Sequence, residues 1–313
     1  MAGSSPSHHM HRWKFPVATF RALALSLISA SAAHVRGQPG CAAFAPGVWI
    51  DWRRGQVHVQ ASVVLRQGAL EFLACWPGKE HESILRLEAD AVHLYMALGL
   101  IGLQPGHPPL WNAQRRCYDP PAGDLLDILL EWEDAGGVHR VEACQWLYAV
   151  RAAAPPVPRP WVFAGSLLRP DNRLAAQYSG VGIALVDFPD SFICYSRCYP
   201  SRYGELWAVA NTPDIPPVGT PVRLVLRPAQ PRRYKVVLDR RGMLWVNGNY
   251  CEVDDLADLL RRSRELRAGH VQLIEVTGTL RGHVTRVAQQ LAAAGVPEPA
   301  VRFQCGPLRL RPG

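Results

Sequence analysis

Short apolar segments, each closed by glycine or proline, constrain the fold of this 313-residue chain more than any other feature. The segments 57–65 and 125–132 combine aliphatic residues with partial polar–apolar alternation. Segments of this length between turn residues are typical of strands rather than helices. Because 26 glycines and 27 prolines punctuate the chain, we expect a β-rich middle region.

The other segments of the middle region follow the same pattern, with one exception. Residues 89–103 carry apolar side chains at helical spacing, among them Val92, Tyr95 and Met96, and Pro105 follows them, so they predict a helix. The prolines of 152–160 exclude regular structure there. The predicted strands are 47–52, 57–65, 70–75, 83–88, 125–132, 138–142, 161–163, 182–186, 192–195, 206–209 and 222–226.

The pattern changes after a proline-flanked linker at 229–233. Strands are predicted at 234–239, 244–246, 271–276 and 301–303, and helices at 253–266 and 282–294. Asp254 and Asp255 suit the positive end of the first helix. The expected fold class is therefore α+β with two domains, a β-rich mixed middle domain and a small ββαβαβ domain. Their predicted limits are 47–228 and 234–305, followed by a tail at 306–313.

The first residues have the layout of a secretory signal. Arg12, Lys14 and Arg21 precede the apolar segment 22–28, and small residues fill 29–33. This pattern predicts a signal peptide at 1–33 and export to the periplasm or cell surface, with a flexible mature N-terminus at 34–46. The alternative is an uncleaved N-terminal segment that tethers the chain to the inner membrane.

The net charge of +8 belongs to the two ends of the chain. Residues 1–33 carry +3, 34–230 carry −1 and 231–313 carry +6. Nucleic-acid binding requires a basic stripe with stacking aromatic residues, and the C-terminal arginines fall instead in scattered pairs such as Arg240 and Arg241. We therefore expect no nucleic-acid partner.

The eight cysteines form no Cys-x-x-Cys motif, so zinc-ribbon and ferredoxin spacings are absent. Only Cys194 and Cys198 are close in sequence. A disulfide between them, or two thiols, is favoured over a metal half-site.

One polar turn interrupts apolar surroundings and offers the best candidate site. Cys75 precedes Lys79, Glu80, His81 and Glu82, and Lys79 is the only lysine between positions 15 and 234. Histidine with carboxylates suits a divalent metal or a small ligand. The competing interpretation is a structural turn whose charged groups bond one another and the backbone. The candidate metal ligands are His81, Glu82, His93 and His107.

The middle region resembles the YdjY-like domain of bacterial exported proteins over 47–228. The residues behind this resemblance are the segment 68–75, the motif Lys79-Glu80-His81-Glu82-Ser83 and the segments 97–100, 161–166 and 217–222. The resemblance implies an exported domain without an assigned reaction.

The C-terminal region resembles the periplasmic domain of ExbD/TolR proteins over 234–304. The hairpin that ends at Val246-Asn247-Gly248 and the helix that runs into Ala294-Gly295-Val296 carry this resemblance. It implies a module that contacts an envelope protein or forms a homodimer, and the basic charge extends this to an anionic envelope component. No apolar spanning segment directly precedes residue 234, so a motor role does not carry over.

These observations predict an exported bacterial envelope protein that binds or interacts without catalysis. The alternative is a metal- or cofactor-binding redox or hydrolytic protein with its site between Cys75 and Glu82.

Overall fold

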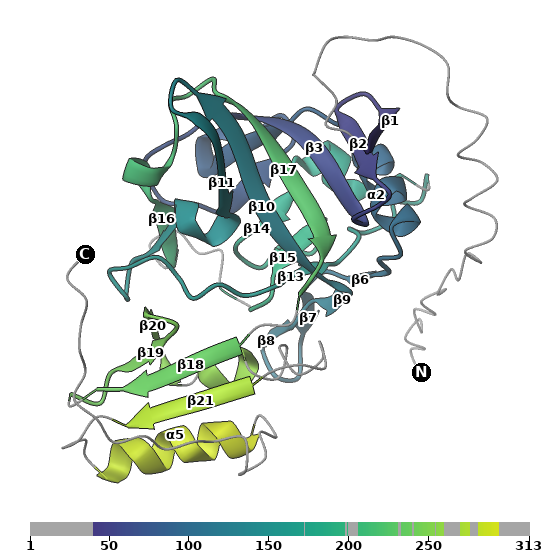
Figure 1. The fold of residues 1–313 in the computed structure, drawn as a ribbon. Coiled ribbons are helices and arrows are strands. Elements are labelled where there is room, and N and C mark those ends of the chain that lie inside the picture. The colour runs from purple at the N-terminus through teal and green to yellow at the C-terminus, as the bar shows by residue number, and fades with distance from the viewer. Residues whose placement is uncertain are drawn as a thin grey trace, which may run out of the picture. The chain divides into compact units, whose positions relative to one another are not determined.

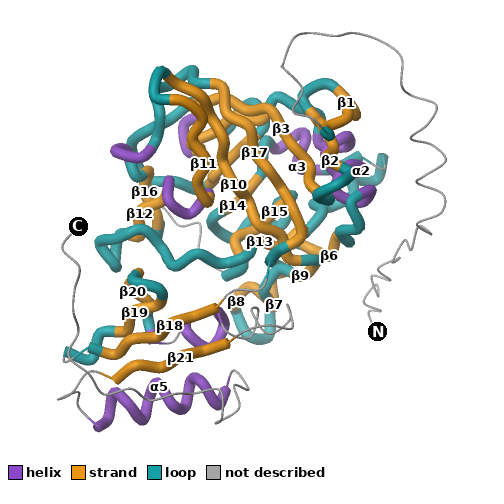
Figure 2. The backbone as a smooth tube through the Cα atoms, in the orientation of Figure 1, coloured by secondary structure: helices purple, strands orange, loops and turns teal. Residues whose placement is uncertain are grey.

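The computed structural model describes residues 40–171, 173–197, 199, 206–230, 233–239, 241–253, 255–259, 270–275 and 281–293. Strands dominate this part of the chain, and helices are few (Figures 1 and 2). The expectation of a strand-rich middle region is confirmed.

Eight strands of the middle region form a sheet that closes on itself. Each strand pairs with the next in the order given below, and the last pairs with the first. Closure removes the free edges that an open sheet would expose. The order is β3 (Gln56–Val63), β17 (Pro221–Pro228), β10 (Leu125–Asp134), β13 (Trp161–Phe163), β15 (Ile193–Tyr195), β14 (Ile183–Ala184), β4 (Phe72–Cys75) and β5 (Ser83–Leu87).

Three further strands extend this closed sheet. β2 (Val48–Asp51) pairs with the first half of β3, and β1 (Cys41–Ala45) pairs with β2. β11 (Gly137–Glu142) forms a hairpin with β10, and both strands fall on segments predicted from the sequence. In Figure 1, β10, β11 and β17 run side by side.

One side of these strands contributes to a single large apolar core. On β3, Val57, Val59 and Ala61 are fully buried in it, because alternate residues of a strand point to the same face. Trp76, Phe163 and Phe192 fill it with aromatic rings, and Trp76 packs edge-on against Phe192 at 5.4 Å between centroids. Polar residues at the intervening positions of β3 therefore face away from this core.

β4 and β5 run parallel although few residues connect them. Phe72 aligns with Ser83 and Ala74 aligns with Leu85. Parallel neighbours commonly need a crossover of a dozen or more residues, but here the connection only has to return along one short strand. The polar turn at 76–82 makes this return and ends in the 3-10 helix η2 (Glu80–Glu82).

The predicted helix at 89–103 is shorter in the structure and forms α2 (Ala91–Leu100). Asp90 caps it, and its side chain accepts a hydrogen bond from the backbone N–H of Val92 at 2.8 Å. The indole Nε1 of Trp76 donates to the carbonyl oxygen of Ala89 at 2.6 Å. This hydrogen bond ties the end of β4 to the segment that begins α2.

Shorter elements complete the middle region. The paired strands are β6 (Pro105–His107) with β9 (Ala122–Gly123), β7 (Leu110–Asn112) with β8 (Cys117–Asp119), and β12 (Leu147–Ala149) with β16 (Ala208–Ala210). The short helices are η3 (Ala143–Trp146), α3 (Ala175–Ser179) and η4 (Thr212–Asp214).

The C-terminal region contains a second sheet. Its strands follow the order β20 (Asn249–Cys251), β19 (Leu244–Val246), β18 (Arg233–Leu238) and β21 (His270–Glu275), and β18 and β21 are parallel. Residues 255–259 are helical, and α5 spans Arg281–Ala293. The predicted strand at 301–303, the tail and the predicted signal lie outside the described residues.

One prediction about local structure needs correction. Residues 41–45, expected to be flexible, form β1, because their backbone pairs with β2 despite the small side chains of this segment. Within the described part of the chain, no helix is long and apolar enough to cross a membrane.

Candidate functional site

The predicted polar turn places Glu82 beside a residue that the sequence pattern does not single out. Because Phe72 aligns with Ser83, the residues before them, Glu71 and Glu82, lie next to each other. The backbone N–H of Glu71 donates to the carbonyl oxygen of Glu82 at 3.1 Å. The register of β4 and β5 therefore creates a pair of neighbouring carboxyl groups, which we call the carboxyl pair.

The carboxyl pair holds a proton near neutral pH. Burial, the adjacent charge of Glu82 and a side-chain hydrogen bond to Glu82 raise the pKa of Glu71 to about 7, and Lys79 opposes this shift. Two carboxyl groups in hydrogen-bond contact are stable only when one of them is protonated. Near pH 7 the pair therefore exchanges between one and two negative charges.

Two nitrogen-bearing side chains of the turn approach the same oxygen of Glu82. Lys79 Nζ lies 3.7 Å and His81 Nε2 lies 3.6 Å from Glu82 Oε2. Both distances exceed hydrogen-bond length. Glu82 Oε2 is buried and has no hydrogen-bond partner among the described residues. This oxygen therefore has two nearby basic groups but no hydrogen bond within the described part of the chain.

An aromatic pair and a glycine lie next to Lys79 of the turn. Phe72 stacks on Phe188 with ring centroids 5.1 Å apart, and Lys79 Nζ lies 5.9 Å from the Phe72 ring centroid. Gly180 has a φ of +81°, and a Cβ there would lie 3.0 Å from the Cγ of Lys79. A glycine at 180 therefore lets the backbone after α3 close against the lysine stem.

The surroundings of Cys75 and Glu80 favour structural roles for these two residues. Cys75 is buried, and burial raises the pKa of its thiol to about 11, so it is neither a thiolate nucleophile nor an open ligand at neutral pH. Glu80 accepts a hydrogen bond from the backbone N–H of Gly78 at 2.8 Å and so fixes the turn. His81 is exposed over 68% of its side chain.

The four predicted metal ligands do not form one cluster. His93 lies on α2 with a buried Nδ1, and His107 Nδ1 lies 2.8 Å from the carbonyl oxygen of Pro108. Among the described residues, one group of three or more histidine, cysteine or acidic side chains has its ligand atoms within 4.8 Å of one another, and it contains none of these four. The geometry thus gives no support to His81, Glu82, His93 and His107 as a joint ligand set.

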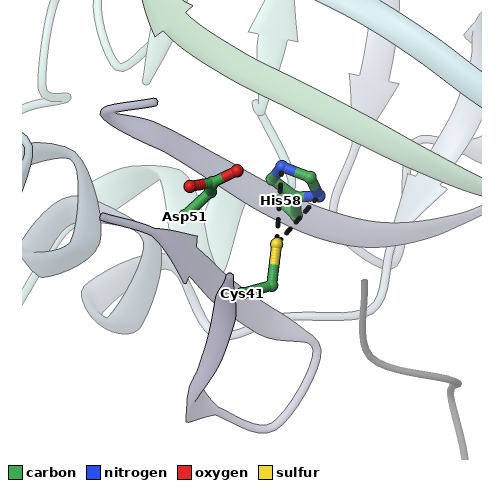
Figure 3. A group of neighbouring side chains, drawn as sticks. All are labelled: Cys41, Asp51 and His58. Carbon is green, nitrogen blue, oxygen red and sulfur yellow. Dashed lines mark hydrogen bonds between the residues drawn. The ribbon is translucent and has the colours of Figure 1, made fainter. Parts of the chain in front are cut away.

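That one group consists of Cys41, Asp51 and His58 (Figure 3). Cys41 aligns with Asp51 across β1 and β2, and Asp51 aligns with Gln56 across β2 and β3. His58 lies two residues beyond Gln56, on the same face of the sheet. The three side chains come from three neighbouring strands and meet on the face opposite the apolar core.

The group is closely packed and surrounded by arginines. His58 is 4% exposed and Asp51 is 1% exposed. Cys41 Sγ lies 3.9 Å from both ring nitrogens of His58. Burial, followed by the charge of Arg223, lowers the pKa of His58 to about 4, so its imidazole is neutral at physiological pH.

Asp51 remains ionised because of its hydrogen bonds. Its Oδ1 accepts from the backbone N–H groups of Arg53 and Arg54 at 3.0 Å, and Arg54 Nη1 lies 2.8 Å from Oδ2. These bonds outweigh burial and lower the pKa of Asp51. Burial and the charge of Asp51 raise the pKa of Cys41. The group therefore holds a thiol, a neutral imidazole and a carboxylate.

The sequence alone does not predict this group, because Cys41 falls in a segment whose small residues indicate flexibility. The alternation of 57–65 already places His58 opposite the buried valines, and a hairpin from 47 to 59 brings Asp51 near it. The pairing of β1 is the missing element. The Cys194–Cys198 disulfide stays a prediction, since Cys194 is buried on β15 and Cys198 lies outside the described residues.

Comparison with known proteins places the middle region in a family. The family model of the YdjY domain matches residues 48–227, which is more than half of the chain and includes β2 and the strands of the closed sheet. No curated protein and no solved structure matches the chain. The chain therefore belongs to the YdjY domain family.

Proposed function

We propose that this chain is an exported, non-catalytic binding protein whose YdjY domain takes a small organic cation at a site formed by Glu71, Lys79 and Glu82. The observation that carries this proposal is the carboxyl pair with its buried Glu82 Oε2, which has no hydrogen-bond donor among the described residues. A buried carboxylate oxygen without a donor is costly, and an N–H donor from a ligand removes that cost.

The chemistry of the site favours an amine or guanidinium over an anion. Near pH 7 the proton held by Glu71 reduces the repulsion between the two carboxyl groups. A cationic ligand can replace this proton, and the pair then carries two negative charges. The buried Phe72 ring stacks on Phe188 and lies 5.9 Å from Lys79 Nζ, so an aromatic group already accompanies a cation at this turn. Binding should therefore release a proton.

Isothermal titration tests this class of ligand. Purified protein at pH 7 is titrated with putrescine, L-lysine and L-arginine, and with acetate as an anionic comparison. We expect saturable binding of at least one cation, with a heat that depends on the ionisation enthalpy of the buffer. Absence of binding by all three cations, or binding of acetate alone, would contradict the proposal.

Two conservative variants locate the site. Glu82→Gln keeps the shape of the side chain but removes its charge, and should weaken cation binding at least tenfold, about 1.4 kcal/mol. Glu80→Gln changes a carboxylate of the same turn that bonds Gly78 instead and should leave binding unchanged. Equal effects of both variants would point to a general charge effect.

Hydrolysis is the second candidate function, because paired carboxyl groups that share a proton can act as general acid and base. Turnover of a chromogenic ester such as p-nitrophenyl acetate would favour it, provided that Glu71→Gln and Glu82→Gln abolish turnover and Glu80→Gln keeps it. Stoichiometric cation binding without turnover favours the binding function.

The export and the C-terminal module belong to the same proposal. The charged start, apolar segment and small residues of 1–33 support a secretory signal. The sequence resemblance over 234–304 is the support for an ExbD/TolR-like ββαβαβ module at 234–305, to whose expected order the structure adds the strand β20. Its basic charge suits an envelope protein, an anionic envelope polymer or a homodimer. Cell fractionation of the full chain and of a variant without residues 1–33 tests export, and retention of both in the cytoplasm would contradict it.

A further inference from the structure

We propose that Cys41, Asp51 and His58 form a zinc site, separate from the carboxyl pair. The three side chains offer sulfur, oxygen and nitrogen from β1, β2 and β3, and their ligand atoms lie within 4.8 Å of one another (Figure 3). Thiolate, imidazole and carboxylate are the ligands that Zn²⁺ takes in proteins. Three protein ligands leave one position of a tetrahedral ion for water.

The distance between Cys41 and His58 fits a single ion between these two side chains. Zinc–sulfur bonds of about 2.3 Å and zinc–nitrogen bonds of about 2.0–2.1 Å let one ion reach across at most about 4.4 Å. Cys41 Sγ lies 3.9 Å from each nitrogen of His58, so this pair is already within reach. Because the sulfur is equally far from both nitrogens, a turn of the ring about its Cβ–Cγ bond directs either one at the ion, and that torsion is broad.

Binding of zinc by this group is linked to one proton, because zinc binds cysteine as the thiolate. On binding, the sulfur–hydrogen bond of Cys41 breaks, a sulfur–zinc bond forms, and the proton leaves to solvent.

Charge balance sets a limit on which ion the site accepts. Arg54, Arg140 and Arg223 all influence His58 and disfavour added positive charge. The thiolate and Asp51 together neutralise a dication, provided that Asp51 exchanges its bond to Arg54 for the ion. A hard ion such as Mg²⁺ prefers oxygen ligands, so we expect binding of Zn²⁺ and Co²⁺ but not of Mg²⁺.

Metal titration of the purified, reduced full chain tests the site. We expect one Zn²⁺ per chain in competition with a chromogenic chelator, and release of one proton at pH 7. Substitution by Co²⁺ should give a sulfur-to-cobalt charge-transfer band in the near ultraviolet. Because loss of a residue that merely orients a ligand already costs about 10–100-fold in affinity, Cys41→Ser and His58→Ala should each weaken binding at least about 100-fold.

Two variants outside the group serve as controls. Cys117 is an exposed cysteine on β8, and His81 is an exposed histidine of the polar turn. Cys117→Ser and His81→Ala should keep both the stoichiometry and the cobalt band. Far-ultraviolet circular dichroism checks that each variant is folded, and Cys41→Ser, which changes one atom of a partly exposed side chain, keeps the test decisive if His58→Ala does not fold.

The outcomes separate this inference from the proposed function. Zinc binding that survives Cys41→Ser, or that is lost in His81→Ala, would overturn the site, as would the absence of zinc binding. Neither result bears on the titration of organic cations, which depends on Glu82. Zinc binding lost only in Cys41→Ser and His58→Ala establishes it.

Discussion

The backbone N–H of Glu71 donates to the carbonyl oxygen of Glu82 at 3.1 Å, and the two side chains lie close enough for the charge of Glu82 to raise the pKa of Glu71. This relationship depends on the parallel register of β4 and β5 rather than on either residue alone. A return connection that were longer or shorter by one residue would separate the two carboxyl groups.

The pKa of Glu71 predicts how stability depends on pH. Its folded value of about 7 lies above the ordinary value of 4.5, so the folded chain binds more protons than the unfolded chain between these limits, and stability falls as pH rises through them. Glu71→Gln, which mimics the protonated form, should be more stable than the original chain at pH 8 by about 1 kcal/mol, given partial screening by solvent. At pH 4.5 the two should be nearly equal.

Denaturant unfolding at pH 4.5 and pH 8 checks this expectation. Glu133→Gln, at an exposed position of β10, is the matched control and should show no such pH-dependent gain. A Glu71→Gln variant that is less stable than the original chain at pH 8 would contradict the raised pKa of Glu71, because it would show that two charged carboxylates are tolerated there.

Gly180→Ala should disturb the carboxyl-pair site through Lys79. A Cβ at this position would lie 3.0 Å from Lys79 Cγ and 3.1 Å from the carbonyl oxygen of Pro77, at a φ of +81°. We expect a loss of stability of about 1–2 kcal/mol and weaker cation binding. Gly55→Ala separates strain from contact, because Gly55 also has a positive φ but a Cβ there would meet nothing within 4 Å. It should lose stability without any change in binding.

Trp76→Phe should destabilise the middle domain by about 1–3 kcal/mol. The indole Nε1 donates to the carbonyl oxygen of Ala89 at 2.6 Å in a fully buried position, and phenylalanine leaves that oxygen without its donor. Trp111→Phe, at a side chain that is 58% exposed, should change stability by less than about 0.5 kcal/mol. Equilibrium unfolding in urea measures both, and similar losses would show that the hydrogen bond contributes little.

Zinc should stabilise the folded chain if it binds where we propose. At a free concentration of about 100 times the dissociation constant, the free energy of unfolding should rise by about 2.7 kcal/mol. Removal of zinc with a chelator should reverse this gain. Cys41→Ser should show no gain at the same zinc concentration, whereas Cys117→Ser should show it in full; a gain in both variants would place the ion elsewhere. Thermal unfolding with and without zinc measures the difference.

The strands of the middle region could be predicted because alternation and turn residues are local signals. The β10–β11 hairpin, for example, follows from apolar segments on either side of Gly136 and Gly137. The closing pair of β3 with β5, and the neighbours β14 and β4, join segments far apart in the chain. No local pattern specifies such pairs, because they depend on which faces pack together in the core.

The residues of the candidate sites also differ in whether a local sequence signal reveals them. The turn from Lys79 to Glu82 is visible as a polar interruption in an apolar sequence. Its partner Glu71 is not, because only the register of two strands places it there. Cys41 carries no signal of its own, since its role depends on a strand formed by small residues.

The two halves of β3 have different neighbours on one edge, β2 along 56–59 and β5 along 61–63. The β1–β2 hairpin therefore pairs with the closed sheet only along the first half of β3, although Val48 and Ile50 of β2 are buried in the same core. An ion held by Cys41, Asp51 and His58 would join the β1–β2 hairpin to β3 by a second link. Amide hydrogen exchange in 41–51 would then slow on metal loading while exchange in β10 and β17 stays constant.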